Sequence, residues 1–345
     1  MHRERPGILR ERSGEWDRLP GMLELRGLTK RYGATVAVDD LTCVFEPGRV
    51  TGFLGPNGAG KTTTMLLALG LQRATAGWAR VGGRSYADLP TPMREVGALL
   101  DAQAIHPNRS GRAHLSALAA SNRLPGRRVG EVLERVGLDA VAGRRAGTYS
   151  LGMKQRLGIA AALLGDPGIL LLDEPINGLD PNGIAWARGL LRELAAEGRT
   201  VILSSHLMSE MELTADHLVV IGRGRLIADT SLASFLAGAL PPQVLVRAET
   251  PTPAFVAALR SAGAEVRVDP DEALLVSGLD AGRVGRIAFA ERMVLTELTP
   301  RRGSLEEVFM SVTAEAVEFS GARIVAEPRS AMPGETVAHT FGGRR

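Results

Sequence analysis

Residues 55–62 read Gly55-Pro56-Asn57-Gly58-Ala59-Gly60-Lys61-Thr62. This stretch matches the pattern GxxxxGK[ST] of a phosphate-binding loop, or P-loop. Its glycines let the backbone turn its N–H groups inward around an anion, and a helix that follows adds a positive end. Residues 51–54 before the stretch form a short apolar run typical of a strand, and residues 62–71 after it have helical spacing. The surroundings are therefore the ones that the motif requires.

The P-loop pattern assigns a contact to each of its polar side chains. Lys61 is predicted to reach the β and γ phosphates, and the Thr62 hydroxyl to coordinate Mg²⁺. Thr63, at the start of the expected helix, can donate to the α phosphate. The predicted ligand is a nucleoside triphosphate with Mg²⁺.

A second motif supplies the acids that such a site needs. Residues 169–175 read Ile169-Leu170-Leu171-Leu172-Asp173-Glu174-Pro175. A continuous apolar run is typical of a central parallel strand, and open α/β sheets bind ligands at the carboxyl ends of their strands. Asp173 is predicted to complete the Mg²⁺ shell, and Glu174 to act as the general base on the attacking water.

The order of apolar patterns predicts the fold class. From residue 22 to about residue 237, strand patterns alternate with helical ones, which favours an α/β domain with a mostly parallel sheet. Residues 90–166 are mostly helical by spacing and are interpreted as a helical subdomain inserted into that domain. Residues 1–21 are charged and without period, and are predicted to be disordered.

A second, smaller domain is predicted from residue 240 to residue 312. Its patterns give the order βαββαβ, which is the ferredoxin-like order of an α+β domain. A last helix begins at the capping box Ser304-Leu305-Glu306-Glu307 and presents apolar residues on one face. Residues 313–345 contain several prolines and glycines and are predicted to be disordered. No catalytic set is evident in this domain, which is interpreted as a packing or dimer-stabilising appendage.

Composition excludes several classes of protein. The 345 residues carry a net charge of +3 and a single cysteine, Cys43, so neither an internal disulfide nor a thiolate metal site is expected. The mild charge does not require a nucleic-acid partner. The longest apolar runs, such as residues 159–164, are far shorter than the roughly 18–20 residues of a membrane-spanning helix.

The residues between the two motifs indicate a family. Residues 149–156 read Tyr149-Ser150-Leu151-Gly152-Met153-Lys154-Gln155-Arg156. This stretch resembles the ABC signature, usually Leu-Ser-Gly-Gly-Gln, at the start of a helix. Leu151 and Met153 depart from that pattern, while Ser150 and Gly152 keep it. The resemblance implies that Ser150, Gly152 and the helix N-terminus cap the γ-phosphate bound to the opposite subunit of a dimer.

Three further stretches strengthen the resemblance to ABC ATPases, which covers about residues 22–237. Asn177-Gly178-Leu179-Asp180-Pro181 resembles the D-loop of the family, in which Asp180 would link the two sites. Ser204-Ser205-His206 ends the next predicted strand, where the family places a histidine that contacts the γ-phosphate. Tyr32 matches the aromatic residue that stacks on adenine. The fold class implied is a P-loop NTPase of the ABC type with ATP as its nucleotide.

One position departs from the family in a way that leaves two alternatives. Most members carry a glutamine after the strand at residues 96–100, where it senses Mg²⁺ and the membrane partner. This sequence has Asp101 there, and Gln103 two residues later. Either Asp101 takes the role with a shorter, charged side chain, or a local shift brings in Gln103. We favour Asp101, which would then be a further ligand of Mg²⁺.

The resemblance implies a transport ATPase that works with separate integral-membrane permease subunits. Two copies would enclose two ATP molecules at the cytoplasmic face of the cell membrane. A Ser-Leu-Gly-Met-Lys-Gln-Arg variant and a Ser-Leu-Glu-Glu-Val-Phe end resemble ATPases of drug- and antibiotic-exporting transporters, which implies export. The alternative is a non-transport ABC ATPase acting on nucleic acid or the ribosome, but the single P-loop, the single cysteine and the absence of sustained heptads disfavour it. A binding module without hydrolysis is disfavoured by Glu174.

Overall fold

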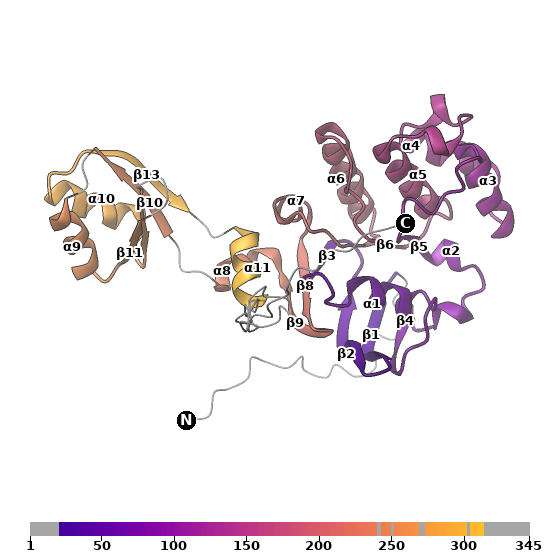
Figure 1. The fold of residues 1–345 in the computed structure, drawn as a ribbon, viewed down its shortest axis with the longest axis horizontal. Helices are drawn as coiled ribbons and strands as arrows, with labels where there is room; N and C mark the ends of the chain where they lie inside the picture. The colour runs from indigo at the N-terminus through magenta and orange to yellow at the C-terminus, as the bar shows by residue number, and fades with distance from the viewer. Residues whose placement is uncertain (1–20, 240–242, 250–251, 269–272, 302–303, 314–345) are drawn as a thin grey trace, which may run out of the picture.

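The computed structural model describes residues 21–239, 243–249, 252–268, 273–301 and 304–313. The two segments predicted to be disordered, 1–21 and 313–345, lie outside the described residues except for Gly21 and Thr313. Figure 1 shows the arrangement of the elements in the described part of the chain.

The larger part of the chain is built on a six-stranded sheet with the order β5-β6-β7-β3-β8-β9. Its first five strands in that order pair in parallel, and β9 pairs antiparallel to β8. The strands are β3 (Val50–Leu54), β5 (Val96–Leu99), β6 (Ile169–Leu172), β7 (Thr200–Leu203), β8 (His217–Gly222) and β9 (Arg225–Ser231). The prediction of a mostly parallel α/β sheet is confirmed.

Both faces of this sheet are covered, which explains the continuous apolar runs. In β6, Leu170 and Leu172 face one core cluster, whereas Ile169 and Leu171 face another. Successive side chains of a strand point to opposite faces, so a strand buried on both sides has no polar position. One face is covered by α5 (Leu151–Leu163) and α6 (Pro181–Ala196).

The other face is covered by a three-stranded antiparallel sheet and a helix. The sheet has the order β2-β1-β4, and it consists of β1 (Leu23–Tyr32), β2 (Thr35–Phe45) and β4 (Ala76–Val81). The helix is α1 (Lys61–Ala68), which begins directly after the P-loop. The rings of Phe45 in β2 and Phe53 in β3 meet edge to face with 5.9 Å between centroids, so the two sheets share one apolar core.

The predicted helical subdomain corresponds mainly to α3 (Gly111–Ser121), α4 (Arg127–Arg135) and α5. Its predicted range, 90–166, also contains the short helix α2 (Pro92–Glu95) and the strand β5, which pairs with β6 along its whole length. The first part of that range therefore belongs to the sheet, and the helical group begins after β5.

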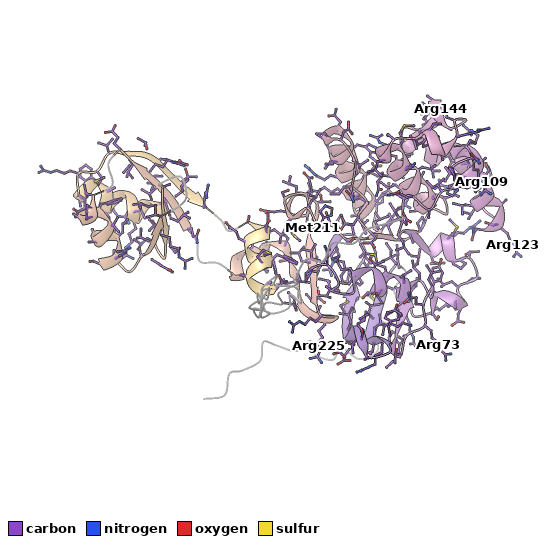
Figure 2. The ribbon with its side chains drawn as sticks, in the orientation of Figure 1. Arg73, Arg109, Arg123, Arg144, Met211 and Arg225 are labelled. Carbon is purple, nitrogen blue, oxygen red and sulfur yellow. The ribbon has the colours of Figure 1, made fainter. Side chains whose placement is uncertain are left out.

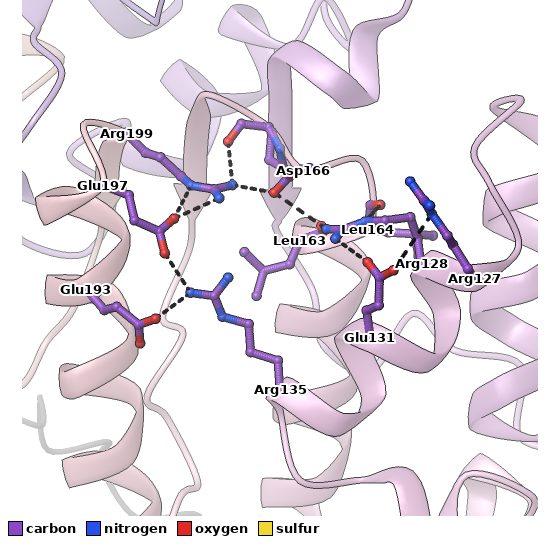
Figure 3. A network of polar contacts seen from close by, with 11 residues as sticks. Arg127, Arg128, Glu131, Arg135, Leu163, Leu164, Asp166, Glu193, Glu197 and Arg199 are labelled. Carbon is purple, nitrogen blue, oxygen red and sulfur yellow. Dashed lines mark hydrogen bonds and ion pairs between the residues drawn. The ribbon is translucent and has the colours of Figure 1, made fainter.

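Charged side chains connect this helical group to the rest of the domain (Figure 3). Arg135 of α4 makes ion pairs with Glu193 and Glu197, at the end of α6, at 2.9 and 3.0 Å. Arg199 binds the same Glu197 at 2.8 Å and Asp166 at 3.0 Å. Burial opposes ionisation of Glu197, but hydrogen bonds from Arg135 and Arg199 outweigh it and lower the pKa of that carboxyl. The network joins the end of α4 to the end of α6.

A small antiparallel sheet follows α8 (Leu232–Ala239). Its order is β11-β12-β10-β13, and its elements are β10 (Gln243–Ala248), α9 (Pro253–Ser261), β11 (Glu265–Val268), β12 (Leu274–Ser277), α10 (Ala281–Ala290) and β13 (Leu295–Arg301). The element order βαββαβ agrees with the prediction. Val244, Val246 and Val276 of the sheet pack with Phe255 and Val284 of the two helices in a separate core.

The last helix, α11 (Leu305–Thr313), was predicted as part of this small domain. Its capping box is present, since the Ser304 hydroxyl accepts from the Glu307 N–H at 3.2 Å and a Glu307 carboxylate oxygen accepts from the Ser304 N–H at 2.9 Å. Its apolar face, however, packs on α7 (Met208–Thr214) and α8 in the larger core. Placing α11 in the small domain was therefore wrong: amphipathic spacing predicts a buried face but not the surface that buries it.

We expect Leu305→Ala to lower the free energy of unfolding of the larger part by about 2–5 kcal/mol, because Leu305 is fully buried there. Met310→Ala, on the same helix but 58% exposed, should change it by less than about 0.5 kcal/mol. Urea unfolding followed by tryptophan fluorescence measures this, since all tryptophans precede α8. Equal, small effects of both variants would contradict the packing of α11 on this core.

Candidate functional site

The candidate site lies at the carboxyl ends of three neighbouring strands, β6, β7 and β3 (Figure 1). The P-loop follows β3, Asp173 and Glu174 follow β6, and His206 lies just after β7. Parallel pairing puts these three ends at one edge of the sheet. Segments separated by more than a hundred residues in the sequence are thereby brought together.

Close backbone contacts explain the glycines of the P-loop. A Cβ on Gly60 would lie 2.3 Å from the Ala37 carbonyl oxygen of β2, and Gly60 has a φ of 102°. A Cβ on Gly55 would lie 2.6 Å from the Ile221 carbonyl oxygen of β8. Side chains at either position would push the loop away from the sheet. Asn57 and Gly58, at the tip of the loop, are exposed.

The Lys61 ammonium folds back over its own loop. It donates to the carbonyl oxygens of Gly55 at 2.6 Å and Pro56 at 3.3 Å. Burial lowers the pKa of Lys61, and the negative charges of Glu174 and Asp173 oppose that effect. An ammonium that exchanges neutral carbonyl oxygens for an anionic phosphate oxygen gains the Coulomb attraction between opposite charges. Thr63, half-buried, continues the first turn of α1.

Oxygen atoms suited to a hard cation lie side by side next to this loop. The Thr62 hydroxyl donates to a carboxylate oxygen of Asp173 at 2.7 Å. The other carboxylate oxygen of Asp173 accepts from the Ser204 hydroxyl at 2.5 Å. Mg²⁺ prefers oxygen ligands and takes only one or two carboxylates from a protein in phosphate sites. The donor set of Thr62 and Asp173 fits that ion.

Glu174 is held on several sides. Its N–H donates to the Ser204 hydroxyl at 3.0 Å, and its carboxylate lies 2.8 Å from Nδ1 of His206. Its carbonyl oxygen accepts from the Asn177 N–H at 3.2 Å and from the Gln155 side chain at 2.8 Å. The side chain keeps 30% of its surface exposed, and that of His206 keeps 56%. A carboxylate and an imidazole therefore face the solvent edge together, next to the P-loop.

The signature-like stretch lies beside the D-loop-like stretch and apart from the P-loop. Ser150 is the N-cap of α5, with its hydroxyl accepting from the Met153 N–H at 3.2 Å. A Cβ on Gly152 would lie 3.4 Å from the Gly178 carbonyl oxygen, so the two stretches touch. Asp180 caps α6 by accepting from the Gly183 N–H at 3.0 Å. Among the residues that the structure describes, no hydrogen bond or ion pair joins Ser150, Gly152 or Asp180 to the P-loop.

Tyr32 stands at the rim, at the end of β1, with 46% of its surface exposed. Its hydroxyl is hydrogen-bonded to the side-chain carbonyl oxygen of Gln72. The Lys30 ammonium lies 4.9 Å from the centre of its ring and donates to the Arg73 carbonyl oxygen at 2.8 Å. These contacts fix the ring from its edge and from one face.

Asp101 follows β5, and its side chain is engaged in its own turn. A carboxylate oxygen accepts from the Gln103 N–H at 2.7 Å. Within the described part of the chain, neither Asp101 nor Gln103 is hydrogen-bonded to Thr62 or Asp173. The alternatives predicted for this position are both left open by these contacts.

The structure adds residues that the sequence did not single out. Ser204 bridges Asp173 and Glu174, Gln155 binds the Glu174 backbone, and Gln72 and Lys30 hold Tyr32. Ser204 could have been recognised from its place directly after an apolar strand, next to the predicted histidine. Gln155 and Gln72 give no signal in a single sequence, because they bind Glu174 and Tyr32, which lie 19 and 40 residues away. Lys30 is only two residues from Tyr32, but nothing in the sequence pattern indicates that its ammonium covers the ring.

Comparison with known proteins points in one direction. A family model described as ABC transporter matches residues 38–177, and one described as a domain of unknown function matches residues 242–306. The uncharacterized ABC transporter ATP-binding protein YhcH of Bacillus subtilis (strain 168) is 42% identical over 209 residues, 60% of this chain and 68% of the relative. The bacitracin transport ATP-binding protein BcrA of Enterococcus faecalis is 40% identical over 215 residues, 61% and 70% of the two chains.

A further relative is the lantibiotic transport ATP-binding protein SrtF of Streptococcus pyogenes, 35% identical over 208 residues, 60% of this chain and 90% of that one. Among solved structures, an ATP-binding subunit of an ABC transporter has a TM-score of 0.57 at 28% identity, covering 62% of this chain and 91% of that chain. A dimeric ATP-binding cassette bound to ADP and Pi has a TM-score of 0.56 at 22% identity, covering 61% and 98%. The latter likeness concerns the fold alone.

We expect Ser204→Ala to leave the Glu174 N–H without its acceptor, which costs about 1–3 kcal/mol of unfolding free energy. Nucleotide hydrolysis should fall as well, because the same hydroxyl holds Asp173. The control is Ser205→Ala, which removes an equally buried hydroxyl that accepts from the Leu207 N–H instead. Urea unfolding and phosphate release measure both effects. If the two variants hydrolyse nucleotide alike, Ser204 has no special part in the site.

Proposed function

The chain belongs to the family of ABC transporter ATP-binding proteins and is an ATPase subunit of such a transporter, and we propose that a dimer of two copies powers the export of a peptide antibiotic or similar drug. The observation that carries the catalytic part is the convergence of Lys61 with Asp173 and Glu174 at the carboxyl ends of β3 and β6, the two strands that flank β7. The likeness to bacitracin and lantibiotic transport proteins supports the choice of cargo.

In the proposed nucleotide complex, residues 55–60 surround the phosphates with backbone N–H groups, and Lys61 moves from Gly55 and Pro56 to the β and γ phosphates. Thr63 contacts the α phosphate. Tyr32 stacks on adenine with the face that Lys30 does not cover. The fixed position of the Tyr32 ring supports this role, since a platform held in advance loses less freedom on binding.

Thr62 and Asp173 would hold Mg²⁺, with Asp101 as a further candidate ligand. When bound, this ion neutralises charge on the phosphate oxygens. Glu174 orients a water molecule, whose oxygen bonds to the γ-phosphorus while the bond to the β–γ bridging oxygen breaks. One proton of that water passes to the Glu174 carboxylate, and the other stays on the oxygen that is now bonded to phosphorus. His206 contacts Glu174 through Nδ1 and is proposed to donate from Nε2 to a γ-phosphate oxygen. The two contacts together require a proton on each ring nitrogen, because both oxygens are acceptors.

Two copies are proposed to share each nucleotide. Ser150 and Gly152 begin α5, whose N-terminus carries a partial positive charge suited to a phosphate. They make no hydrogen bond to the P-loop of their own chain within the described residues, which supports a role toward the nucleotide of a second copy. Asp180, beside them, would link the two sites. That a solved cassette with this fold is dimeric with ADP and Pi supports the same arrangement.

Permease subunits in the membrane are the proposed partners, which puts the chain at the cytoplasmic face of the membrane. ABC ATPases pair with membrane subunits, and no helix within the described residues combines the length and apolar character needed to cross a bilayer. The helical group α3–α5 is the proposed contact. Figure 2 shows Arg109, Arg123 and Arg144 at its outer edge, all exposed and, among the described residues, without an ion pair. A nucleic-acid partner is not proposed.

The domain organisation proposed is an ATPase domain at residues 22–237 and a small ferredoxin-like domain that begins near residue 240. The sheet order β13-β10-β12-β11 with α9 and α10 on one face supports the ferredoxin-like assignment. Since α11 packs in the larger core, we propose that the small domain ends with β13 and that α11 completes the ATPase domain.

We expect Glu174→Gln to bind Mg·ATP but to hydrolyse it at least about 100-fold more slowly, because the amide cannot take the proton. A stable dimer should then accumulate with Mg·ATP and be visible by size-exclusion chromatography. Lys61→Ala is the matched control, which should neither bind ATP nor form this dimer. Turnover at the level of the unmodified protein in Glu174→Gln would remove Glu174 as the base.

Export is tested in the organism that carries the gene. Replacing Lys61 by Ala at the chromosomal locus should lower the minimal inhibitory concentration of a peptide antibiotic such as bacitracin as much as deleting the gene does. The physical reason is that a subunit without nucleotide cannot drive its permease. Unchanged susceptibility to peptide antibiotics and drugs in both strains would contradict the export proposal and leave the ATPase assignment intact.

A further inference from the structure

Gln155 is a buried polar residue. It belongs to α5 and is only 5% exposed, at the start of the buried part of that helix, which continues with Leu157 and Gly158. Its side-chain nitrogen Nε2 donates to the backbone carbonyl oxygen of Glu174 at 2.8 Å. A carbonyl oxygen only accepts, so the amide nitrogen, and not the amide oxygen, must face it. The buried amide nitrogen of Gln155 is therefore satisfied by the backbone carbonyl oxygen of Glu174, the proposed catalytic residue.

The backbone that Gln155 holds has an unfavourable conformation. Glu174 has a φ of 51°, in the left-handed region that residues with a Cβ rarely adopt. Such conformations persist only where the surroundings enforce them. Here three contacts do so, from Ser204 to the N–H of Glu174 and from Gln155 and Asn177 to its carbonyl oxygen. The direction of the Glu174 side chain depends on this conformation.

We propose that Gln155 is a positioning residue for hydrolysis, which keeps the Glu174 backbone left-handed so that the carboxylate points to the attacking water. This inference rests on the proposed role of Glu174 as the base. Of the three contacts, the one from Asn177 closes a local turn, and the one from Ser204 comes from the neighbouring strand. Only Gln155 ties Glu174 to α5, the helix that begins with Ser150.

The first measurement separates positioning from binding. Gln155→Leu keeps the size of the side chain and removes the donor. We expect kcat to fall about 10- to 100-fold, because a small displacement of a catalytic group has effects of that size, while the Kd for Mg·ATP changes less than twofold. Equal losses in kcat and ATP affinity, or an unchanged kcat, would overturn the proposal.

A second variant gives a signature that a structural role would not produce. Gln155→Glu has nearly the same shape, but its carboxyl can donate to the Glu174 carbonyl only when protonated. Its kcat relative to that of the unmodified protein should therefore rise as the pH is lowered. A ratio that stays flat with pH would contradict the hydrogen bond as the cause.

Mixed dimers test whether Gln155 acts on the base of its own chain. Each dimer has one P-loop disabled by Lys61→Ala. With Gln155→Leu on the chain whose P-loop is intact, hydrolysis should fall about 10- to 100-fold, as in the first measurement. With Gln155→Leu on the Lys61→Ala chain, hydrolysis should equal that of the dimer without Gln155→Leu. Ser150→Ala, less than two turns away on the same helix, should give the opposite pattern.

The two proposals can fail separately in this experiment. If Gln155→Leu follows the pattern of Ser150→Ala, or impairs both mixed dimers equally, the positioning role is wrong. If Ser150→Ala is fully active in both dimers, the proposal of shared nucleotides fails instead. The kcat and pH measurements on Gln155 variants then still decide the positioning role.

Discussion

The hydrogen-bond register of three parallel strands is the constraint on which the site depends. Leu172 of β6 is level with Leu203 of β7, which is level with Gly52 of β3. Asp173 and Ser204 therefore leave the sheet side by side, and β3 extends a little further before the P-loop turns back. A slip by one residue would turn every side chain of a strand to the other face. Because both faces are buried, such a slip would also put Asp173 or Ser204 into apolar surroundings, which opposes it.

This constraint explains what the sequence could predict. The P-loop, the acidic strand end and the sheet class are encoded locally, by glycines next to Lys61 and by an apolar run that ends in Asp173. The contacts of Gln155 and Ser204 with Glu174 are not encoded locally, because the partners are about 20 and 30 residues apart in the sequence and meet only in the folded chain. The role of Asp101 stays a prediction for a related reason: its short carboxylate is satisfied by the turn that contains it. The Gln103 side chain is longer, but within the described residues no hydrogen bond joins it to Thr62 or Asp173.

The departures from the usual signature acquire a physical meaning in the fold. Leu151 stands where the family pattern has glycine, and its side chain lies against Gly178, where a Cβ would be only 2.2 Å away. Gly178 has a φ of 75°, so this position suits glycine for two reasons. The start of α5 is thereby packed against the turn that leads into α6, and Arg156 stacks on Trp186 of α6 at 4.3 Å further along. Both contacts join α5 to α6, so the ends that would meet a second copy belong to one packed unit.

The position of α11 gives the small domain a connection to the nucleotide site. The Leu305 N–H, at the start of α11, donates to the carboxylate of Glu212 at 3.0 Å. Glu212 lies on α7, which begins two residues after His206. A carboxylate is favourable at the N-terminus of a helix, so α7 and α11 are joined by an electrostatic contact as well as by apolar packing. Any displacement of His206 that carries α7 with it must move α11 or break this contact. The chain enters the small domain after α8 and leaves it just before α11, and both helices pack in the larger core. The two helices that flank the small domain in the chain, α8 and α11, pack on each other, and α11 contacts α7, which follows His206.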